Sequence, residues 1–294
     1  MNFLVYGSVN LDFVYELDHI VRPGETITVD RFTRHFGGKG ANQAAALARA
    51  GMPVSMAGKV GPDGECELEK LAEFGADVSN VVRDPAATTG RGIIQLAADG
   101  ENAICVFPGA NRQITRDEIE TVLAKFVPGD LLLLQNEINH IDFLIETAAA
   151  RGLEVAFNPS PFTPELLDLP LEKVSVLIVN QVEASQVTGL SETAGSDTLL
   201  DALAAKLPDC EIVLTLGSRG AAWARGNDRC TVPALKVKPV DTTGAGDTFI
   251  GYFLAGRARK FTPEACLALG CRASAIAVTR LGAMGSIPAI TELL

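Results

Sequence analysis

The segment DTTGAGDTF, residues 241–249, combines a glycine-rich turn with acidic residues and is the stretch best suited to chemistry. Glycine lets a ligand approach the backbone closely, so the N–H groups of Gly244, Ala245 and Gly246 can bind a phosphate-sized anion where a helix begins. Asp247 places a carboxylate beside that anion. This arrangement suits transfer of a phosphoryl group to a hydroxyl whose proton the carboxylate accepts. An ordinary glycine turn with an aspartate at a helix start is the alternative.

A second glycine-rich segment, FGGKGANQA at residues 36–44, precedes a helical pattern. Its glycines let backbone N–H groups approach a polyhydroxyl ligand, and Lys39 and Asn42 add a charged donor and a side-chain amide. The spacings of a P-loop and of a GxGxxG dinucleotide motif are both absent. A tight turn with a solvated lysine is the alternative.

The later segment TLGSRGA, residues 215–221, suits a nucleotide or phosphate, or is a plain hairpin turn.

Short apolar runs alternate with helical patterns along most of the chain. The runs typical of buried strands are 3–9, 54–60, 131–134, 155–157, 176–179 and 212–216. The helical patterns between and after them are 41–50, 65–74, 116–126, 141–151, 198–207, 248–258 and 263–279. This alternation predicts an α/β fold, with a doubly wound, mainly parallel sheet flanked by helices on both faces.

Polar residues follow several of these apolar runs, where the strands are expected to end. They are Asn10 and Asp12 after the first run, and then Asn136, Glu137, Asn158, Asn180 and Gly217. Ligands of a doubly wound sheet bind beyond the carboxyl ends of its strands, so these residues are expected to gather at one edge. Taken singly, each is more often a turn residue or a helix cap.

Two segments, 11–36 and 91–107, interrupt the alternation with extended, helix-free sequence. They contain ITVDRFTRHF and GIIQLAADGENAICVF, with a turn expected at Asp99 and Gly100. We expect these segments to pair as a small β-sheet lid inserted into a single domain that spans residues 1–294. The exposed face of the lid is expected to be apolar, which favours a homodimer formed through it.

The composition argues against several classes of protein. A net charge of −11 without any basic run argues against nucleic-acid binding, and no apolar stretch reaches the roughly 18 residues of a membrane span. The six cysteines have no CxxC spacing and are accompanied by only three histidines, which favours reduced thiols over a zinc site. The N-terminus lacks the basic region of a signal peptide, so a cytoplasmic location is expected.

Several segments together resemble the ribokinase branch of the PfkB family of carbohydrate kinases. They are GSVNLD at 7–12, RPGETI at 22–27, FGGKGANQA at 36–44, PGAN at 108–111, NEI at 136–138, NPSP at 158–161, NQVEASQVTG at 180–189, TLGSRGA at 215–221, DTTGAGDTF at 241–249 and AIAVTRLGA at 275–283. The resemblance covers nearly the whole chain, and the order and separation of its two glycine-rich segments are highly specific. It implies ATP-dependent phosphorylation of the primary hydroxyl of a sugar.

The resemblance also implies a role for each matching residue. The sugar hydroxyls would be held by Asn10, Asp12, Gly38, Lys39, Asn42 and Glu137. Asp247 would be the catalytic base, and the anion hole would comprise Gly244, Ala245 and Gly246. ATP and its Mg²⁺ would be bound by Asn180, Glu183, Thr215, Gly217, Ser218, Arg219, Gly220, Gly246 and Cys271. A monovalent cation, K⁺, would be bound by Asp241, Thr243, Ala277, Arg280, Gly282 and Ser286, mostly through backbone carbonyls.

The FGGKGAN and GSVNLD forms favour ribose or deoxyribose as the substrate, with conversion of D-ribose to ribose 5-phosphate as the main expectation. Fructose, ketodeoxygluconate and nucleosides are substrates of kinases with a similar layout, and a sugar-binding regulator without turnover is an alternative of another class.

Two residues depart from the family pattern. Cys271 stands where a histidine is common near the adenine, and Phe107 replaces a more polar residue before PGAN. Phe107 bears on sugar choice if its side chain faces the pocket.

Overall fold

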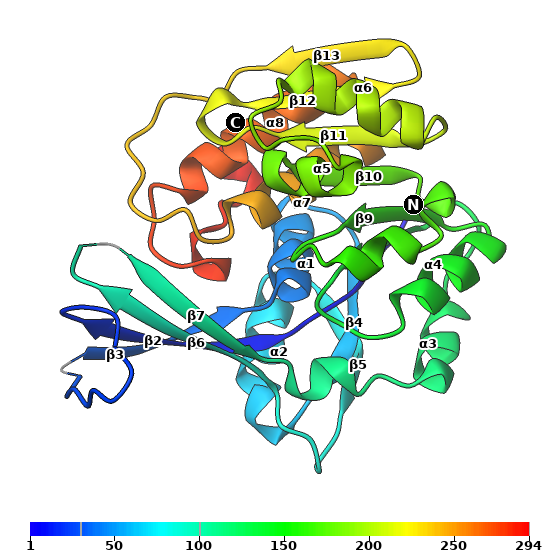
Figure 1. Ribbon diagram of the computed structural model, residues 1–294. Coiled ribbons are helices and arrows are strands. Elements are labelled where there is room, and N and C mark those ends of the chain that lie inside the picture. Colours follow the sequence, from blue (N-terminus) through cyan, green and yellow to red (C-terminus); the bar gives the residue numbers. More distant parts are fainter. Residues whose placement is uncertain (30, 100, 294) are drawn as a thin grey trace.

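A nine-stranded, mostly parallel sheet forms the centre of the fold (Figure 1). The computed structural model describes residues 1–29, 31–99 and 101–293, so the turn expected at Asp99 and Gly100 lies partly outside the described residues. The strands, in their order across the sheet, are β13 (Asp228–Val232), β12 (Ala221–Arg225), β11 (Glu211–Thr215), β10 (Val176–Asn180), β9 (Glu154–Asn158), β8 (Leu131–Gln135), β1 (Phe3–Tyr6), β4 (Val54–Val60) and β5 (Asp77–Arg83). Neighbouring strands run parallel, except that β12 is antiparallel to both β11 and β13.

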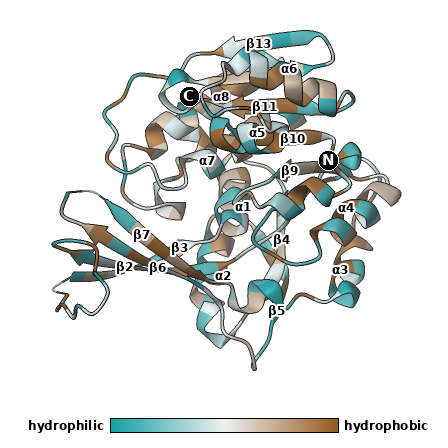
Figure 2. Cartoon of the chain, viewed as in Figure 1, coloured by the Kyte–Doolittle hydropathy of each residue, from teal (hydrophilic) through white to brown (hydrophobic). Residues whose placement is uncertain are grey.

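Helices cover both faces of this sheet, which confirms the predicted fold class. They are α1 (Lys39–Arg49), α2 (Glu65–Glu73), α3 (Arg116–Leu123), α4 (Ile141–Ala150), α5 (Gln181–Thr188), α6 (Ser196–Lys206), α7 (Ala245–Ala258) and α8 (Pro263–Ala277). Phe3 and Val5 pack in a core with α1, α2, α7 and α8, whereas Leu4 and Tyr6 pack in a second core with α3 to α6. Both faces of the strands are therefore buried, which explains their unbroken apolar runs (Figure 2). In the described part of the chain, no helix is long and apolar enough to cross a bilayer.

The apolar runs predicted most of these elements but missed β5, β13 and α5. The sequences of these three elements, DVSNVVR, DRCTV and QVEASQVT, carry few apolar residues in a regular spacing. Helix α7 also begins earlier than predicted, at Ala245 instead of Thr248. The earlier start places Gly246 and Asp247 inside the first helical turn.

A separate four-stranded sheet projects from one side of the molecule (Figure 1), and it confirms the small inserted β-sheet. Its strands, in order, are β3 (Arg31–Gly37), β2 (Asn10–Leu17), β6 (Gly90–Ala97) and β7 (Asn102–Phe107). We refer to this sheet as the lid. Large apolar side chains are exposed on it, namely Phe32, Ile93, Ile104, Val106 and Phe107. The chain enters the lid at Asn10, shortly after β1 ends at Tyr6.

Helices α1 and α7 pack closely because small residues face each other at their crossing. Gly251 of α7 lies against Ala46 of α1, and a Cβ at position 251 would be 2.4 Å from the Ala46 Cβ and 2.9 Å from the Leu47 nitrogen. The crossing lies about one helical turn from Asp247 on α7 and from Asn42 on α1. The glycine therefore sets how closely the polar residues of the two helices approach each other.

Replacing Gly251 with alanine is expected to destabilise the protein by about 1–3 kcal/mol, because the added methyl group overpacks a contact with backbone atoms. The free energy of unfolding in urea measures this loss. Gly285→Ala is the matched control, since a Cβ there meets no atom within 4 Å and the φ angle is not positive. Equal stability of the two variants would contradict the packing constraint.

Candidate active site

The first turn of α7 presents backbone N–H groups and the Asp247 carboxylate to the same space. The N-cap residue Gly244 is left-handed, with φ of 72°, and a Cβ there would lie 3.0 Å from Ala283, so glycine is needed at this position. The N–H of Ala245 donates to a carbonyl of the preceding turn at 3.2 Å. The N–H groups of Gly246 and Asp247 have no acceptor within their own helix, so they are the donors available to an anion. The anion hole predicted at residues 244–246 thus gains the N–H of Asp247.

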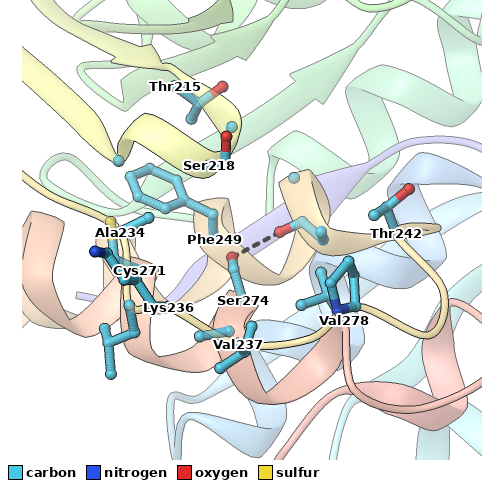
Figure 3. Close-up of a pocket in the computed structure, with 17 residues that line it drawn as sticks. Thr215, Ser218, Ala234, Lys236, Val237, Thr242, Phe249, Cys271, Ser274 and Val278 are labelled. Carbon is cyan, nitrogen blue, oxygen red and sulfur yellow. Dashed lines mark hydrogen bonds between the residues drawn. The ribbon is translucent and has the colours of Figure 1, made fainter.

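An apolar cavity of about 440 Å³ opens beside this turn (Figure 3). Six of the residues predicted to bind a nucleotide line it, namely Thr215, Gly217, Ser218, Gly220, Gly246 and Cys271. Arg219 is an exception, because its guanidinium donates to Gln181 Oε1 and it is absent from the cavity wall. The Ser274 hydroxyl is also occupied, because it donates to the Ala245 carbonyl at 2.8 Å. An apolar wall with so few polar groups suits a flat aromatic base better than a sugar or a phosphate.

A polar cavity of about 260 Å³ adjoins the apolar one. The residues common to both walls are Thr215, Thr242 and Gly246. Asn180 and Glu183 form a capping box at the start of α5, in which Asn180 Oδ1 accepts from the Glu183 N–H at 2.8 Å and Glu183 Oε2 accepts from the Asn180 N–H at 3.0 Å. The box holds the Glu183 carboxylate at the wall of the cavity that Asp247 also lines.

Lys39 brings a positive charge into the polar cavity. Burial by itself would lower the pKa of its ammonium group, but the carboxylates of Asp247, Glu137 and Glu183 raise that pKa above its usual value. Lys39 is therefore charged at neutral pH. It was predicted to bind the sugar, and its place in this cavity also suits the charge of a phosphoryl group.

Glu137 is held against the start of α1. The Ser8 hydroxyl and the Lys39 N–H both donate to Glu137 Oε2, the latter at 2.9 Å. The Gly40 N–H in turn donates to Ser8 Oγ at 3.3 Å. These bonds fix one carboxylate oxygen, and the second oxygen takes no part in them.

Asn10 is oriented by a buried asparagine of the PGAN segment. Asn111 Nδ2 donates to Asn10 Oδ1 at 2.8 Å and to the Val9 carbonyl at 3.3 Å, while Asn111 Oδ1 accepts from the Val9 N–H at 3.0 Å. This arrangement leaves the Asn10 NH₂ group to donate to a ligand.

The Asp12 carboxylate is enclosed by glycines of the neighbouring strands. A Cβ would lie 2.0 Å from Asp12 Oδ2 at Gly37 and 2.4 Å from Asp12 Oδ1 at Gly92, so a side chain at either position would displace the carboxylate. Burial and the charge of Glu137 raise the pKa of Asp12 to about 6, although a hydrogen bond from the Gly92 backbone opposes the rise. Asp12 therefore changes charge just below neutral pH.

A second buried acid, Glu67 of α2, lies close to Asp12. Burial raises the pKa of Glu67 to about 9, with a contribution from the Asp12 charge, so its side chain is neutral at pH 7. Because Glu67 is protonated, it adds no second negative charge next to the Asp12 carboxylate. Its sequence context, ECELEK, did not distinguish it from the exposed acids nearby.

Asn42 and Asp247 meet between α1 and α7. Asn42 Nδ2 donates to Asp247 Oδ2 at 3.0 Å, and both side chains are buried. Asn42 Oδ1 is buried too, and it has no hydrogen-bond partner among the described residues. A buried acceptor without a donor costs free energy, so we expect a ligand hydroxyl to donate to it. This would place the hydroxylated ligand beside the Asp247 carboxylate.

Three residues predicted to bind a monovalent cation meet where the loop before α7 contacts the segment after α8. Asp241 Oδ1 accepts from the N–H of Thr243 at 2.9 Å and from its hydroxyl at 2.7 Å, and Asp241 Oδ2 accepts from the Gly282 N–H at 2.8 Å. Burial alone would raise the pKa of Asp241, but these hydrogen bonds lower it, so the carboxylate is ionised. The carboxylate oxygens keep lone pairs beyond these hydrogen bonds, so Asp241 can still bind a cation, and this role stays a prediction.

The other predicted cation ligands, Ala277, Arg280 and Ser286, lie close together along the chain. The Ala277 carbonyl accepts from the Arg280 N–H at 3.0 Å, and the Arg280 guanidinium pairs with Glu292. The Ser286 hydroxyl donates to the Ala283 carbonyl at 2.7 Å. Ala277 and Arg280 can offer an ion only their backbone oxygens, whereas the Ser286 hydroxyl oxygen keeps its lone pairs, and the cation-binding role of all three residues stays a prediction.

The register of the lid places Phe107 on the face opposite Asp12. Asp12 pairs with Gly92, and Gly92 pairs with Val106, so these three residues share one face of the sheet. Phe107 pairs with Arg91 on the other face, where its side chain is 51% exposed. Val106, which was not predicted as a site residue, instead lies on the face of Asp12.

Several polar residues that shape the site were not predicted as site residues. They are Ser8, Gln43, Glu67, Asn111 and Ser160, whereas Asn158, which lines the polar cavity, was expected at the ligand-binding edge of the sheet. Ser8, Gln43 and Asn111 lie within GSVNLD, FGGKGANQA and PGAN, so these motifs were the available signal. Each of the three directs its polar atoms at another protein group, and a motif does not reveal such contacts.

The chain is similar over its full length to known carbohydrate kinases. Residues 2–290 match the family described as pfkB family carbohydrate kinase. A ribokinase from Schizosaccharomyces pombe is 35% identical, and the alignment covers 100% of this chain and 96% of the yeast protein. The crystal structure of ribokinase from Cryptococcus neoformans in complex with ADP is 36% identical, covers 99% of this chain and 98% of its own, and gives a TM-score of 0.87. The structure of Arabidopsis thaliana ribokinase complexed with ribose and ATP is 28% identical over 99% and 97% of the two chains, with a TM-score of 0.85.

Proposed function

The chain belongs to the pfkB family of carbohydrate kinases, and we propose that it transfers the γ-phosphoryl group of ATP to the primary hydroxyl of D-ribose, giving ribose 5-phosphate. The similarity to ribokinases, one of them solved with ribose and ATP, supports this choice of substrates. The observation that carries the proposal is the position of Asp247. Its carboxylate lines the polar cavity and bonds to Asn42, whose Oδ1 has no partner among the described residues.

The two substrates would approach Asp247 from different sides. The sugar would lie between the lid and α1, where the proposed hydroxyl-binding residues are Asn10, Asp12, Gly38, Lys39, Asn42 and Glu137. The base of ATP would occupy the apolar cavity, and its phosphates would extend into the polar cavity towards the start of α7. The hydroxyl and the γ-phosphoryl group would then meet beside the carboxylate.

In the proposed reaction, Asp247 accepts the proton of the primary hydroxyl. The hydroxyl oxygen forms a bond to the γ-phosphorus while the bond between that phosphorus and the bridging oxygen breaks, and ADP leaves. Phosphoryl transfer has a loose transition state that depends mainly on positioning and on charge stabilisation. The N–H groups of Gly246 and Asp247 and the ammonium group of Lys39 would stabilise the charge on the transferred group.

We also propose Mg²⁺ and K⁺ as cofactors. Mg²⁺ would accompany ATP and neutralise phosphate charge, with Glu183 and Asn180 nearby. Glu183 and Asp247 are the only carboxylates among the described residues of the polar cavity wall, which suits an ion held mostly by phosphates and water. K⁺ would bind at Asp241 and order the loop that leads to Gly244.

A homodimer through the lid is a further part of the proposal. Phe13, Tyr15 and Phe32 form a contiguous aromatic cluster, with ring centroids 5.9 Å apart for Phe13 and Phe32 and 5.2 Å apart for Tyr15 and Phe32. Phe107 lies on the same face by register, and the lid exposes further apolar side chains. Covering such a surface with a second copy would remove it from water.

Asp247→Ala is expected to lower kcat by about two to four orders of magnitude, the usual contribution of a positioned base, while sugar binding is retained. ADP release measured with ribose, deoxyribose, fructose, ketodeoxygluconate and nucleosides tests both the base and the choice of substrate, and calorimetry measures sugar binding. Asp142→Ala, a change of an exposed aspartate on α4, is the control and should leave kcat unchanged. Near-normal turnover by Asp247→Ala would refute the assignment of the base, and ATP consumption with none of the compounds would refute the proposed function.

Replacing K⁺ with Na⁺ at equal ionic strength is expected to lower kcat several-fold with little change in the KM for ATP, because the proposed cation acts by ordering the loop before α7. Asp241→Asn is the informative variant, since it removes the only proposed carboxylate ligand and should abolish the difference between the two salts. Equal rates of the wild type in KCl and NaCl would exclude this cation site.

The KM for the sugar is expected to rise as the pH falls through about 6, the pKa of Asp12, because protonation removes an acceptor for sugar hydroxyls. Above this pKa the carboxylate is ionised, so KM should be constant between pH 7 and 8. Steady-state kinetics across this range measure the effect. In Asp12→Asn, KM should be high at every pH, and a pH-dependent rise that persists in this variant would assign the titration to another group.

A further inference from the structure

A buried amide lies behind the catalytic carboxylate, and no role was assigned to it from the sequence. Gln43 of α1 is fully buried, and its Nε2 lies 2.9 Å from Asp247 Oδ1. We propose that Gln43 is a positioning residue that holds Asp247 in the orientation needed to accept the proton of the sugar hydroxyl. This inference rests on the proposed function of the site.

The two oxygens of Asp247 are held by adjacent residues of α1. Gln43 donates to Oδ1, and Asn42 donates to Oδ2 at 3.0 Å. Both carboxylate oxygens of Asp247 therefore accept a hydrogen bond, which restricts rotation about its Cβ–Cγ bond. Each oxygen still has a free lone pair that can accept a hydroxyl proton.

The orientation of the Gln43 amide follows from the chemistry of its neighbours. An ionised carboxylate only accepts hydrogen bonds, so the NH₂ group of Gln43 must face Asp247. Its Oε1 then faces away, where it accepts from Gln135 Nε2 at 2.7 Å. Gln135 lies at the end of β8 and is also buried. A chain of two amides thus connects the central sheet to the catalytic carboxylate.

Gln43 does not take part in binding either substrate directly. Its side chain is fully buried, and its Oε1 and Nε2 atoms are already bonded to Gln135 and Asp247. Its second contact is with Asn158 Oδ1, at 3.3 Å from Nε2. Loss of the Gln43 amide should therefore lower kcat while leaving the KM values for sugar and ATP nearly unchanged.

The neutrality of the Gln43 amide is part of its role. The amide donates to Asp247 without adding a charge, whereas a carboxyl group at the same place would share a proton with Asp247, because two carboxylates about 3 Å apart do not both ionise near neutral pH. Gln43→Glu keeps the size of the side chain and changes only this property. The variant therefore separates a positioning role from a purely structural one.

The experiment compares kcat and KM between pH 5.5 and 9 for the wild type, Gln43→Leu and Gln43→Glu. Gln43→Leu should lower kcat by about 10- to 100-fold, the effect of losing one hydrogen bond to a charged group. Gln43→Glu should have a low kcat at neutral pH that recovers as the pH rises, so that the acid limb of its profile lies at least one pH unit above that of the wild type. If Gln43→Leu does not fold, the pH profile of the isosteric Gln43→Glu still decides the matter.

A double variant and a control complete the test. In the Asp247→Ala background, Gln43→Leu should cause no further loss, because the carboxylate that it positions is gone. Asn80→Leu is the control, since it removes a buried amide that bonds to Ser55 between β4 and β5, and it should leave the pH profile of kcat unchanged.

The outcomes separate the inference from the function on which it rests. A wild type that phosphorylates ribose and loses this activity in Asp247→Ala supports the function whatever Gln43 does. Equal, pH-independent losses in Gln43→Leu and Gln43→Glu, or a further loss in the Asp247→Ala background, would overturn the role of Gln43 alone. A wild type that phosphorylates no substrate would overturn both.

Discussion

The close approach of α1 and α7 is the constraint on which this site depends. The two helices are separated by almost two hundred residues of chain, so only packing holds Asn42 and Gln43 against Asp247. That packing requires Gly251, because a methyl group there would meet backbone atoms of α1. Hydrogen bonds of 2.9 and 3.0 Å weaken steeply when their partners move apart. Core packing and the geometry of the proposed catalytic base are therefore set by the same contact.

The site concentrates acidic groups yet is proposed to receive an anion. Four carboxylates, those of Asp12, Glu137, Glu183 and Asp247, surround it, and the last three of them act on the charge of Lys39. The chain as a whole carries a net charge of −11. The groups close to the reacting atoms are instead fixed, neutral donors. These donors are the side-chain amides of Asn42 and Gln43 and the backbone N–H groups at the start of α7. Such donors orient charged groups without requiring further desolvated cations.

The sequence predicted those parts of the site whose residues are close together along the chain, and it did not predict contacts between distant segments. The start of α7 and the capping box of α5 are short-range structures, so Gly244 to Asp247 could be singled out from their own segment, and Asn180 and Glu183 from the family resemblance. The face of Phe107 depends on the register between β2, β6 and β7, and no local pattern specifies it. The role of Gln43 depends on the crossing of α1 and α7, which brings together residues distant in sequence. Strand β5 was missed because only two of its residues are fully buried.

The division of the proposed sugar ligands between two structural units gives the lid a function in the reaction. Asn10 and Asp12 belong to β2 of the lid, whereas Asn42 and Asp247 belong to the main body. A sugar that bonds to both groups must hold the lid over α1 while its hydroxyl lies against Asp247. The apolar side chains that the lid bears would then exclude water, which otherwise competes with the sugar for the phosphoryl group. In the proposed reaction, sugar binding and the protection of the phosphoryl group would thus be one event, and a site without sugar would be poorly formed for hydrolysis of ATP.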